Sequence, residues 1–424
     1  MAYRPIAVIT SPVPIGDITK ETYVDGCEIT ITDEDGTGEV IYSHTPRIRG
    51  RGNSTWGQPQ KPFKVRSLNR QQTPFDYAAS RDWALMADYI DESKMRTSVA
   101  YEVARRATGR WAPHSHHVDV TWNGNYWGLY RYSETADVQV GRVDVREMGS
   151  GDTAGNALTG PYVLEADSNY DDPGFRSDRW TAIMYDVPEV VGVPQQEAYI
   201  QGWINDFEDA LVEGTEAEIL ARIDLDSWAD WYLLQESMKN FDSRWERSCK
   251  FIKDQDAPNG TGKIILWPAW DFDLSLGLGW QMTQSPTGWW TRSIQYTEES
   301  VAGHNWINWL WFIWERSPVF RNRVRQRWDT AFRPVLESIG DYIDDLDAEI
   351  APARTRDRAR WHSGSALPAM HSANTIKSWI AARVAWMDAE LPQLASTVQV
   401  STSSEVAMRA YGKGGIPLAV TTKR

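Results

Sequence analysis

The stretch from residue 240 to residue 277 constrains the fold of this chain more than any other. Asp242 lies on a polar loop in KNFDSRWERS, two strand-like runs follow, and Asp271 and Asp273 come directly after the second run in PAWDFDLSLG. The runs are Lys250–Lys253 and Lys263–Trp267, and the turn-forming pair Asn259–Gly260 lies between them. A hairpin of this kind places the two acidic loops side by side. Converging carboxylates suit a general base and a ligand for a hard divalent cation around a phosphate.

The composition indicates a folded chain and narrows its partners. The 424 residues are 42% hydrophobic and 24% charged, as is ordinary for a globular protein with a sizeable core, and 23 Trp is unusually many. A net charge of −14 argues against binding to nucleic acid or anionic membranes, which requires clustered basic residues. We recognise neither a signal peptide nor an apolar run of about 18 residues, so we expect a cytoplasmic protein without a membrane span.

A polar, glycine-rich loop, RGRGNSTW, lies between two strand-like segments. It contains Gly50, Gly52, Asn53 and Ser54, and Arg51 adds positive charge. Glycines allow backbone N–H groups to approach an anion closely, so the loop is a candidate phosphate-binding site. An ordinary hairpin turn is the open alternative.

The strand-like segment after this loop presents a lysine. Phe63 and Val65 alternate with Lys64 and Arg66, so Lys64 belongs to the polar face. A lysine on that face could hold phosphate, and a solvated strand face is the alternative.

A helix is expected to begin near Asp91, a good N-cap, and to end near Thr108, with Gly109 as its stop. Glu102 borders the apolar stripe of this helix. A half-buried glutamate needs a cationic partner, and Lys64 is the candidate. The open alternative is a solvent-facing Glu102 beside the arginines of its own helix.

The remaining periodicity predicts strands at residues 1–46, one further hairpin and several helices. Val118–Tyr132 alternates around the turn Asn123-Gly124. Helices are expected within 195–239 and at 303–335, 341–356 and 373–393, and a strand is expected in the tail at Ile416–Val420. The Trp residues between 306 and 314 are expected in the core, with a partner or glycan surface as the alternative.

Three separated segments together resemble the CotH family of spore-coat protein kinases. They are RGRGNSTW followed by KPFKV, then APHSHHVDVTWNGNYWGLYRYSE, then KNFDSRWERS followed by LWPAWDFDLSLG. The resemblance implies an α+β, bilobal, atypical protein-kinase-like fold with a β-rich N-terminal lobe and a mostly helical C-terminal lobe. Its parts would be a β extension at 1–46, the N-terminal lobe at 47–150, the C-terminal lobe at 151–395 and a tail at 396–424.

The resemblance also implies ATP and Mg²⁺ or Mn²⁺ as cofactors and a partner protein as the Ser/Thr acceptor. The nucleotide would lie against Gly50, Arg51, Gly52, Asn53 and Ser54, with Lys64 on its phosphates and Glu102 orienting Lys64. Asp242 would take or orient the proton of the acceptor hydroxyl.

For the metal, the resemblance implies Asp271 as a ligand, with Asp273 assisting. A kinase catalytic loop has an Asn five residues after its Asp as a second metal ligand. Here Arg247 and Ser248 occupy positions five and six, so Ser248 is the remaining candidate. A hydroxyl is a weaker, neutral ligand, which leaves open a slow kinase or a one-metal enzyme.

Two other functions stay open at this point. A catalytically weak or inactive kinase-like protein, incorporated into a spore coat or a phage particle, would keep the fold for binding. Carbohydrate recognition or hydrolysis would use Trp side chains for stacking and two carboxylates as acid and base. The second alternative gives the glycine-rich loop and Lys64 no role.

Overall fold

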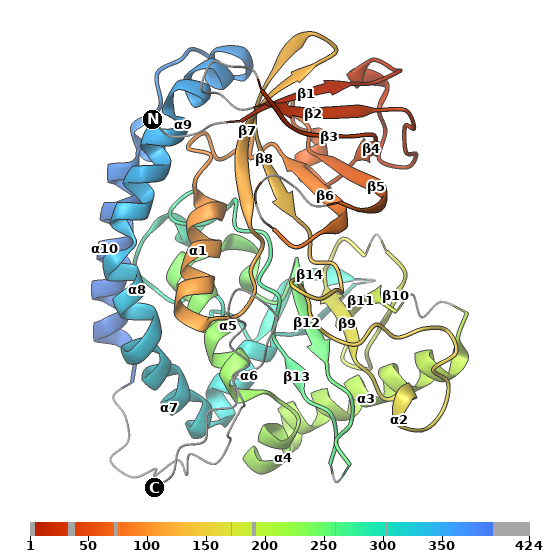
Figure 1. Ribbon diagram of the computed structural model, residues 1–424. Coiled ribbons are helices and arrows are strands. Elements are labelled where there is room, and N and C mark those ends of the chain that lie inside the picture. Colours follow the sequence, from red (N-terminus) through yellow and green to blue (C-terminus); the bar gives the residue numbers. More distant parts are fainter. Residues whose placement is uncertain are drawn as a thin grey trace, which may run out of the picture.

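The structure is a computed structural model that describes residues 5–32, 39–71, 75, 77–170, 172–188, 192–258, 260–301 and 303–392. Its fold is α+β, as expected, with a large curled sheet above a second sheet and several helices (Figure 1). The strand expected at 416–420 lies outside the described residues.

The large sheet has eight strands and contains the described strands of the first 134 residues. Its order is β3 (Val40–His44), β2 (Glu28–Thr32), β1 (Ile6–Thr10), β7 (Ser115–Trp122), β8 (Asn125–Glu134), β6 (Ser80–Met86), β5 (Phe63–Gln71) and β4 (Arg47–Gly50). Strands β1 and β7 run parallel, and the other neighbours are antiparallel. The strands that the structure describes within 1–46 therefore share one sheet with the strands that carry the glycine-rich loop.

The β7–β8 hairpin confirms the turn expected from the sequence. Asn123 and Gly124 have φ angles of 47° and 77°, so both adopt the left-handed conformation that a two-residue hairpin turn requires. Asn and Gly tolerate this conformation best, which fixes the register of the two strands.

The second sheet has five antiparallel strands and carries the hairpin of the acidic loops. Its order is β10 (Gly174–Arg176), β11 (Ala182–Val187), β9 (Tyr162–Ala166), β12 (Cys249–Lys253) and β13 (Ile264–Ile265). Strand β12 pairs with β9 so that Cys249 lies opposite Ala166 and Lys250 opposite Glu165. A short hairpin of β14 (Tyr296–Val301) and β15 (His304–Ile307) forms separately. The predicted pairing of the two runs is confirmed, although Asn259 lies outside the described residues.

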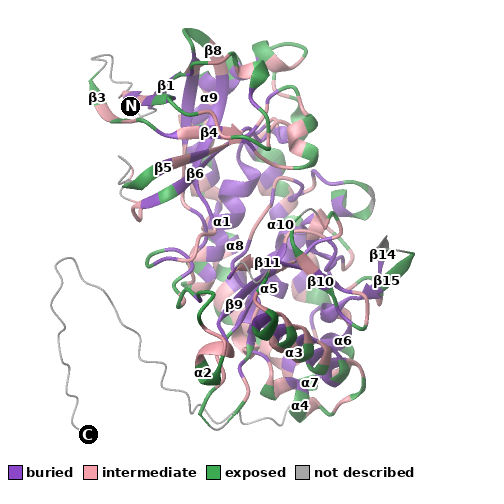
Figure 2. Cartoon of the chain, turned by 90° about the vertical axis from the view of Figure 1, so that its right-hand side faces the viewer, coloured by how far each residue is buried: buried purple, intermediate pink, exposed green. Residues whose placement is uncertain are grey.

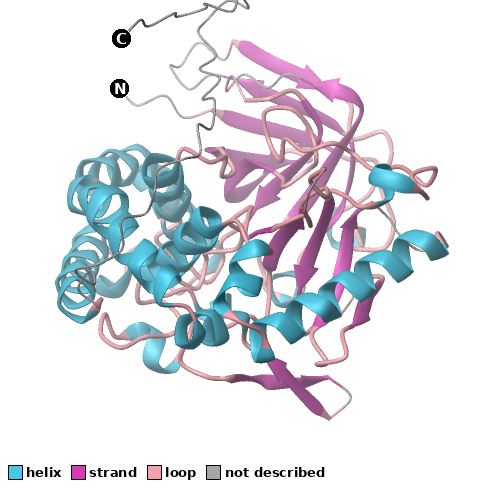
Figure 3. Ribbon diagram, turned by 90° about the horizontal axis from the view of Figure 1, so that it is seen from below, coloured by secondary structure: helices cyan, strands magenta, loops and turns pink. Residues whose placement is uncertain are grey.

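The helices lie mostly on one side of the molecule, although a long helix runs across the strand side (Figure 3). They are α1 (Arg96–Thr108), α2 (Gly155–Leu158), α3 (Pro194–Glu213), α4 (Glu216–Ala221), α5 (Leu225–Met238), α6 (Trp309–Arg316), α7 (Pro318–Arg327), α8 (Arg333–Ser338), α9 (Gly340–Trp361) and α10 (Ala373–Glu390). Within the described part of the chain, no helix combines the length and the apolar character needed to cross a bilayer.

The single helix expected at 303–335 is wrong. Its first residues form β15, and the remainder is split into α6, α7, a π-helical turn (Trp328–Phe332) and α8. The break after α6 has a local cause, because Pro318 cannot donate a backbone hydrogen bond and the Ser317 side chain caps the next helix by accepting from Phe320 N at 3.0 Å.

The main core lies between the helices and the second sheet, where most side chains of α5 are buried (Figure 2). Trp306 and Trp309 are fully buried there, and Trp314 is nearly so. The Trp309 indole donates to Glu208 Oε1 at 2.7 Å and its ring stacks on Trp245 with centroids 4.4 Å apart. These contacts confirm that this aromatic band belongs to the core.

Helix α9 joins the C-terminal helices to the large sheet. It runs up the side of the molecule and reaches β8 (Figure 1). Near its end, the buried Asp357 carboxylate accepts from Leu129 N at 2.8 Å and from Gln60 Nε2 at 2.8 Å, and it lies 3.1 Å from Lys94 Nζ. One side chain of α9 thus satisfies donors from three parts of the N-terminal region.

Candidate active site

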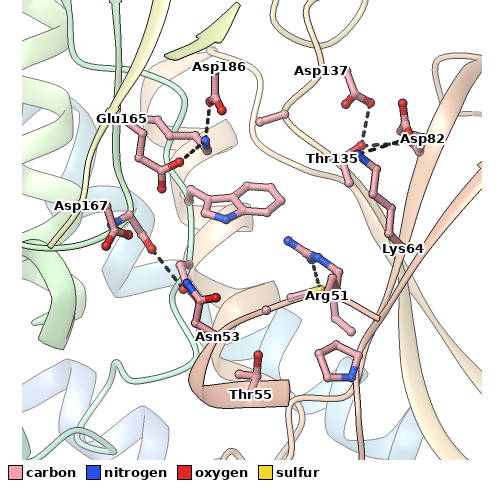
Figure 4. A pocket seen from close by; sticks show the side chains of 18 of the residues that line it. Arg51, Asn53, Thr55, Lys64, Asp82, Thr135, Asp137, Glu165, Asp167 and Asp186 are labelled. Carbon is pink, nitrogen blue, oxygen red and sulfur yellow. Dashed lines mark hydrogen bonds and ion pairs between the residues drawn. The ribbon is translucent and has the colours of Figure 1, made fainter. Parts of the chain in front are cut away.

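A cavity of about 1540 Å³ lies between the large sheet and the five-stranded sheet. The glycine-rich loop, β5 and β6 line it on one side, and β9, β11 and the two acidic loops line it on the other (Figure 4). Asp242, Ser248, Asp271 and Asp273 all line this space. The cavity therefore brings together residues more than two hundred positions apart in sequence.

Direct hydrogen bonds hold the two acidic loops side by side, as the hairpin predicted. The Asn240 side chain donates to Asp271 O at 2.8 Å, and Phe241 N donates to Leu274 O at 3.1 Å. Because these contacts involve backbone atoms of both loops, Asp242 and Asp271 are held at a defined separation rather than on independent segments.

The second acidic loop is fixed from behind by helix α1. Phe272 is fully buried and meets the Tyr101 ring edge to face, with centroids 5.9 Å apart. Asp271 on one side of it has a φ of 58°, a conformation that costs energy for a residue with a side chain. The neighbouring Asp271 and Asp273 both line the cavity.

The carboxyl of Asp242 is tuned by its surroundings. Burial and the negative charge of Asp271 raise its pKa to about 7, against a smaller opposing effect of Arg247. The Arg247 guanidinium nitrogen Nη1 lies 3.6 Å from Asp242 Oδ1. A carboxylate with a pKa near neutrality is suited to accept a proton at physiological pH.

Asp271 and Asp273 are buried carboxyls whose pKa values are both raised. Burial raises the pKa of both, and the charge of Asp271 raises that of Asp273 further. The two buried carboxylates therefore repel each other when both are ionised. A divalent cation between them would offset this repulsion, and carboxylate oxygens are the ligands that Mg²⁺ and Mn²⁺ prefer. This donor set therefore fits such an ion, although no three His, Cys, Asp or Glu side chains among the described residues already surround a metal position.

Ser248 directly contacts Asp271, the candidate metal ligand. Its hydroxyl donates to Asp271 Oδ2 at 3.4 Å, and its backbone N–H donates to Asp167 Oδ2 at 3.0 Å. The φ of Ser248 is 53°, so this residue is also in the left-handed conformation. Ser248 and Asp271 can thus present oxygen atoms to the same position.

Asp167 is a cavity residue that the sequence analysis missed. It follows β9 directly and lies beside Ser248 because β9 pairs with β12 in the register that places Ala166 opposite Cys249. Its negative charge also contributes to the raised pKa of Asp242. The loop after β9 is rich in Asp and Asn, and this composition could have indicated a site residue. Only the strand pairing, however, shows which of these residues reaches the cavity.

The same strand pairing builds a second acidic group on this wall. Lys250 Nζ donates to Glu165 Oε2 and to Asp186 Oδ2, and all three line the cavity (Figure 4). Burial raises the pKa of Glu165 to about 7, although Lys250 opposes this shift. These residues were also missed.

The glycine-rich loop is only partly as expected. Gly50 does not line the cavity; its N–H donates to Thr19 O at 2.7 Å, and a Cβ there would meet the Trp56 ring at 2.4 Å. Arg51 N donates to Pro62 O at 3.2 Å. The N–H groups of Gly52, Asn53 and Ser54, which line the cavity, are therefore the candidates for an anion.

Arg51 is the residue of the glycine-rich loop whose positive charge affects Asp271, the candidate metal ligand. Its guanidinium donates to Met86 Sδ and lies 5.6 Å from the centre of the Trp270 ring. Its charge also lowers the pKa of Asp271 against the effect of burial. A thioether is a weak acceptor, so most of the hydrogen-bonding capacity of Arg51 can serve a phosphate.

The expected ion pair between Glu102 and Lys64 is wrong. Glu102 accepts from the guanidinium groups of Arg105 and Arg106 at 2.7 Å each, and it does not line the cavity. Lys64 lies in the cavity, 3.5 Å from Asp82 Oδ1 (Figure 4). The partner of Lys64 comes from the adjacent strand β6, because Lys64 lies opposite Ala84 in the β5–β6 pairing. Glu102 pairs instead with Arg105 and Arg106, because residues three and four positions apart are neighbours on a helix surface.

A comparison with protein families agrees with the resemblance that the three motifs carry. The family model described as CotH kinase protein matches residues 48–387, so this chain belongs to the CotH family. The family description indicates a kinase-like protein. No curated protein matches the chain.

Proposed function

We propose that this protein transfers the γ-phosphate of ATP to a Ser or Thr hydroxyl of a partner protein with the help of Mg²⁺ or Mn²⁺. In this proposal the large sheet corresponds to the N-terminal lobe of a kinase, and the five-stranded sheet with its helices corresponds to the C-terminal lobe. Family membership supports the kinase class.

The observation that carries the proposal is the meeting of Asp242, Asp271 and Ser248 in one cavity with a cationic loop opposite. Hydrogen bonds link the two acidic loops, and Arg51 acts electrostatically on Asp271 across the space. Phosphoryl transfer needs separate groups for two tasks: some neutralise the charge on the phosphoryl oxygens, and another receives the proton of the acceptor hydroxyl.

Each residue then has a specific task. The N–H groups of Gly52, Asn53 and Ser54, together with Arg51 and Lys64, bind the phosphates. Asp242 accepts the proton of the acceptor hydroxyl, since its raised pKa keeps a neutral and a charged form both accessible near pH 7.

Asp271, Asp273 and Ser248 would hold the divalent cation. The cation would neutralise charge on the phosphate oxygens. The cation would also offset the repulsion between these two buried carboxylates. Asn240 supports this position from behind by holding the backbone of Asp271.

Labelled ATP with Mg²⁺ tests the proposal, using the protein itself and a mixed pool of Ser- and Thr-containing peptides as acceptors. Asp242→Asn and Asp271→Asn keep the side-chain shape but remove the charge, so each should lower transfer by at least about a hundredfold. Glu102→Gln is the matched control, because the same kind of change is made outside the cavity and should leave transfer within about twofold.

Equal labelling in all variants would refute the residue roles. A binding protein without turnover would show no label transfer by any variant while still associating with its partner in the absence of nucleotide. A Mg-ATP-dependent rise in melting temperature that Asp271→Asn removes would support nucleotide binding at this cavity.

A further inference from the structure

Trp280 is unusual among the tryptophans of this chain because its side chain is 51% exposed. The other Trp residues that the structure describes are buried or half-buried. Trp280 lines the cavity, and its ring meets the Phe241 ring edge to face with centroids 5.1 Å apart. An indole left in water at the edge of a candidate active site has a large apolar surface available for contact.

The loop that carries Trp280 is held in one position by three long side chains. They bind six of its backbone carbonyls: Lys239 donates to Met282, Ser285 and Thr287, Arg383 to Pro286 and Gly288, and Trp379 to Gln284. Lys239 and Arg383 are almost completely buried. In addition, the Thr283 hydroxyl donates to Trp280 O at 2.6 Å. The backbone that carries the exposed Trp280 side chain is therefore held in place, which lowers the entropy cost of binding to it.

The surface beneath Trp280 is also fixed and belongs to the catalytic loop. The Phe241 backbone donates to Leu274 O and accepts from the Trp290 indole at 2.9 Å. Phe241, Leu274 and Trp280 all line the cavity, and Phe241 is the residue directly before Asp242. We call these three side chains, of which two are aromatic and one is aliphatic, the aromatic platform.

We propose that the aromatic platform binds a large apolar or aromatic side chain of the acceptor polypeptide, close in sequence to the hydroxyl that is phosphorylated. This inference rests on the proposed function, because it takes Asp242 as the group that receives the hydroxyl proton. The acceptor is the occupant rather than the nucleotide because Phe241 adjoins Asp242, whereas the phosphate-binding candidates Arg51 and Lys64 come from the opposite wall.

A degenerate peptide library with a fixed central Ser or Thr and labelled ATP with Mg²⁺ tests the inference. Wild-type protein should select aromatic or large aliphatic residues at one position within about three residues of the hydroxyl. Trp280→Ala should abolish that selection and raise the KM for a selected peptide about tenfold or more, while the KM for ATP stays within twofold. Trp280→Phe should retain part of the selection.

Met282→Ala is the matched control. Met282 is 57% exposed on the same loop but does not line the cavity, so its loss should leave selection and KM unchanged. Transfer that requires Asp242 but shows no apolar selection would overturn the platform and leave the proposed function intact. A loss of ATP affinity in Trp280→Ala without a change in selection would overturn it as well, since the indole would then serve the nucleotide.

Binding measured without ATP separates the two proposals. If no variant transfers label, fluorescence anisotropy with fluorescein-labelled peptide pools, rich or poor in aromatic residues, still reports on the platform. Preferential binding of the aromatic pool that Trp280→Ala removes would support the platform while the kinase proposal fails. Equal binding by wild type and Trp280→Ala would overturn the platform.

Discussion

Replacing Glu236 with Gln should destabilise the protein by about 3 kcal/mol. Glu236 is completely buried near the end of α5. Its carboxylate accepts from Thr291 N at 2.9 Å, from Trp290 N at 3.1 Å and from Arg383 Nη2 at 2.9 Å. Glutamine has the same shape but no charge, and its amide group would point a donor at groups that are themselves donors.

The expected magnitude depends on the hydrogen bonds that Arg383 retains after Glu236 is replaced. Breaking a buried ion pair by removing one charge costs about 3–5 kcal/mol, because the other charge remains in a medium of low polarity. Arg383 is 1% exposed, but its guanidinium also donates to the carbonyls of Glu236, Pro286 and Gly288 at 2.8 to 2.9 Å. Those three hydrogen bonds survive the substitution, which places the expected loss at the lower end of that range.

Urea unfolding followed by tryptophan fluorescence measures the effect, and a double-mutant cycle with Arg383→Met isolates the pair. We expect a coupling energy of about 2 kcal/mol between the two substitutions. Asp344→Asn is the matched control: Asp344 pairs with Lys377 at 2.6 Å, but it is 55% exposed, so its loss should cost less than about 1 kcal/mol. A Glu236→Gln loss no larger than that of the control, or a coupling near zero, would refute the reasoning.

Three further outcomes are expected. The rate of phosphoryl transfer should rise with pH through about 7 and then level off, because Asp242 accepts a proton only when ionised; a flat profile between pH 6 and 8 would contradict this role. Glu102→Gln should leave the KM for ATP within about twofold, since Glu102 pairs with two arginines of its own helix; a tenfold rise would restore the lysine-orienting role. Gly128→Ala should cost about 3 kcal/mol in urea unfolding, because Gly128 has a φ of 134° and its Cβ would lie 2.5 Å from Asp357 Oδ1; a cost under 1 kcal/mol would show that this region yields easily.

Local features of the fold were predictable from the sequence because their causes are local. Asn123-Gly124 fixes the β7–β8 turn by itself, and Gly109, with a φ of 68°, ends α1 where expected. The two acidic loops also followed from neighbouring residues, since one hairpin carries both. Pro318 was a local signal too, but the apolar periodicity on both sides of it concealed the break between α6 and α7.

The parts of the site that depend on distant pairing could not be predicted. Glu102 and Lys64 lie on α1 and β5, and no pattern within either segment shows how the tertiary fold places these two elements. Asp167 enters the cavity through the pairing of β9 with β12, which are more than eighty residues apart. The exposure of Trp280 could not be predicted either, because the anchoring of its loop depends on Lys239, which follows α5, and on side chains of α10.

The hydrogen bonds of Asp357 have a consequence for synthesis of the chain. Its partner Leu129 N lies 228 residues earlier, and Lys94 lies earlier still. When the strands of the large sheet leave the ribosome, the acceptor for these buried donors has not yet been made. These donors therefore lack this acceptor until α9 has been made, and a truncation before residue 357 would leave a buried ammonium and a buried N–H group without this partner. Helix α9 thus completes the hydrogen bonding of a sheet whose strands lie far earlier in the chain.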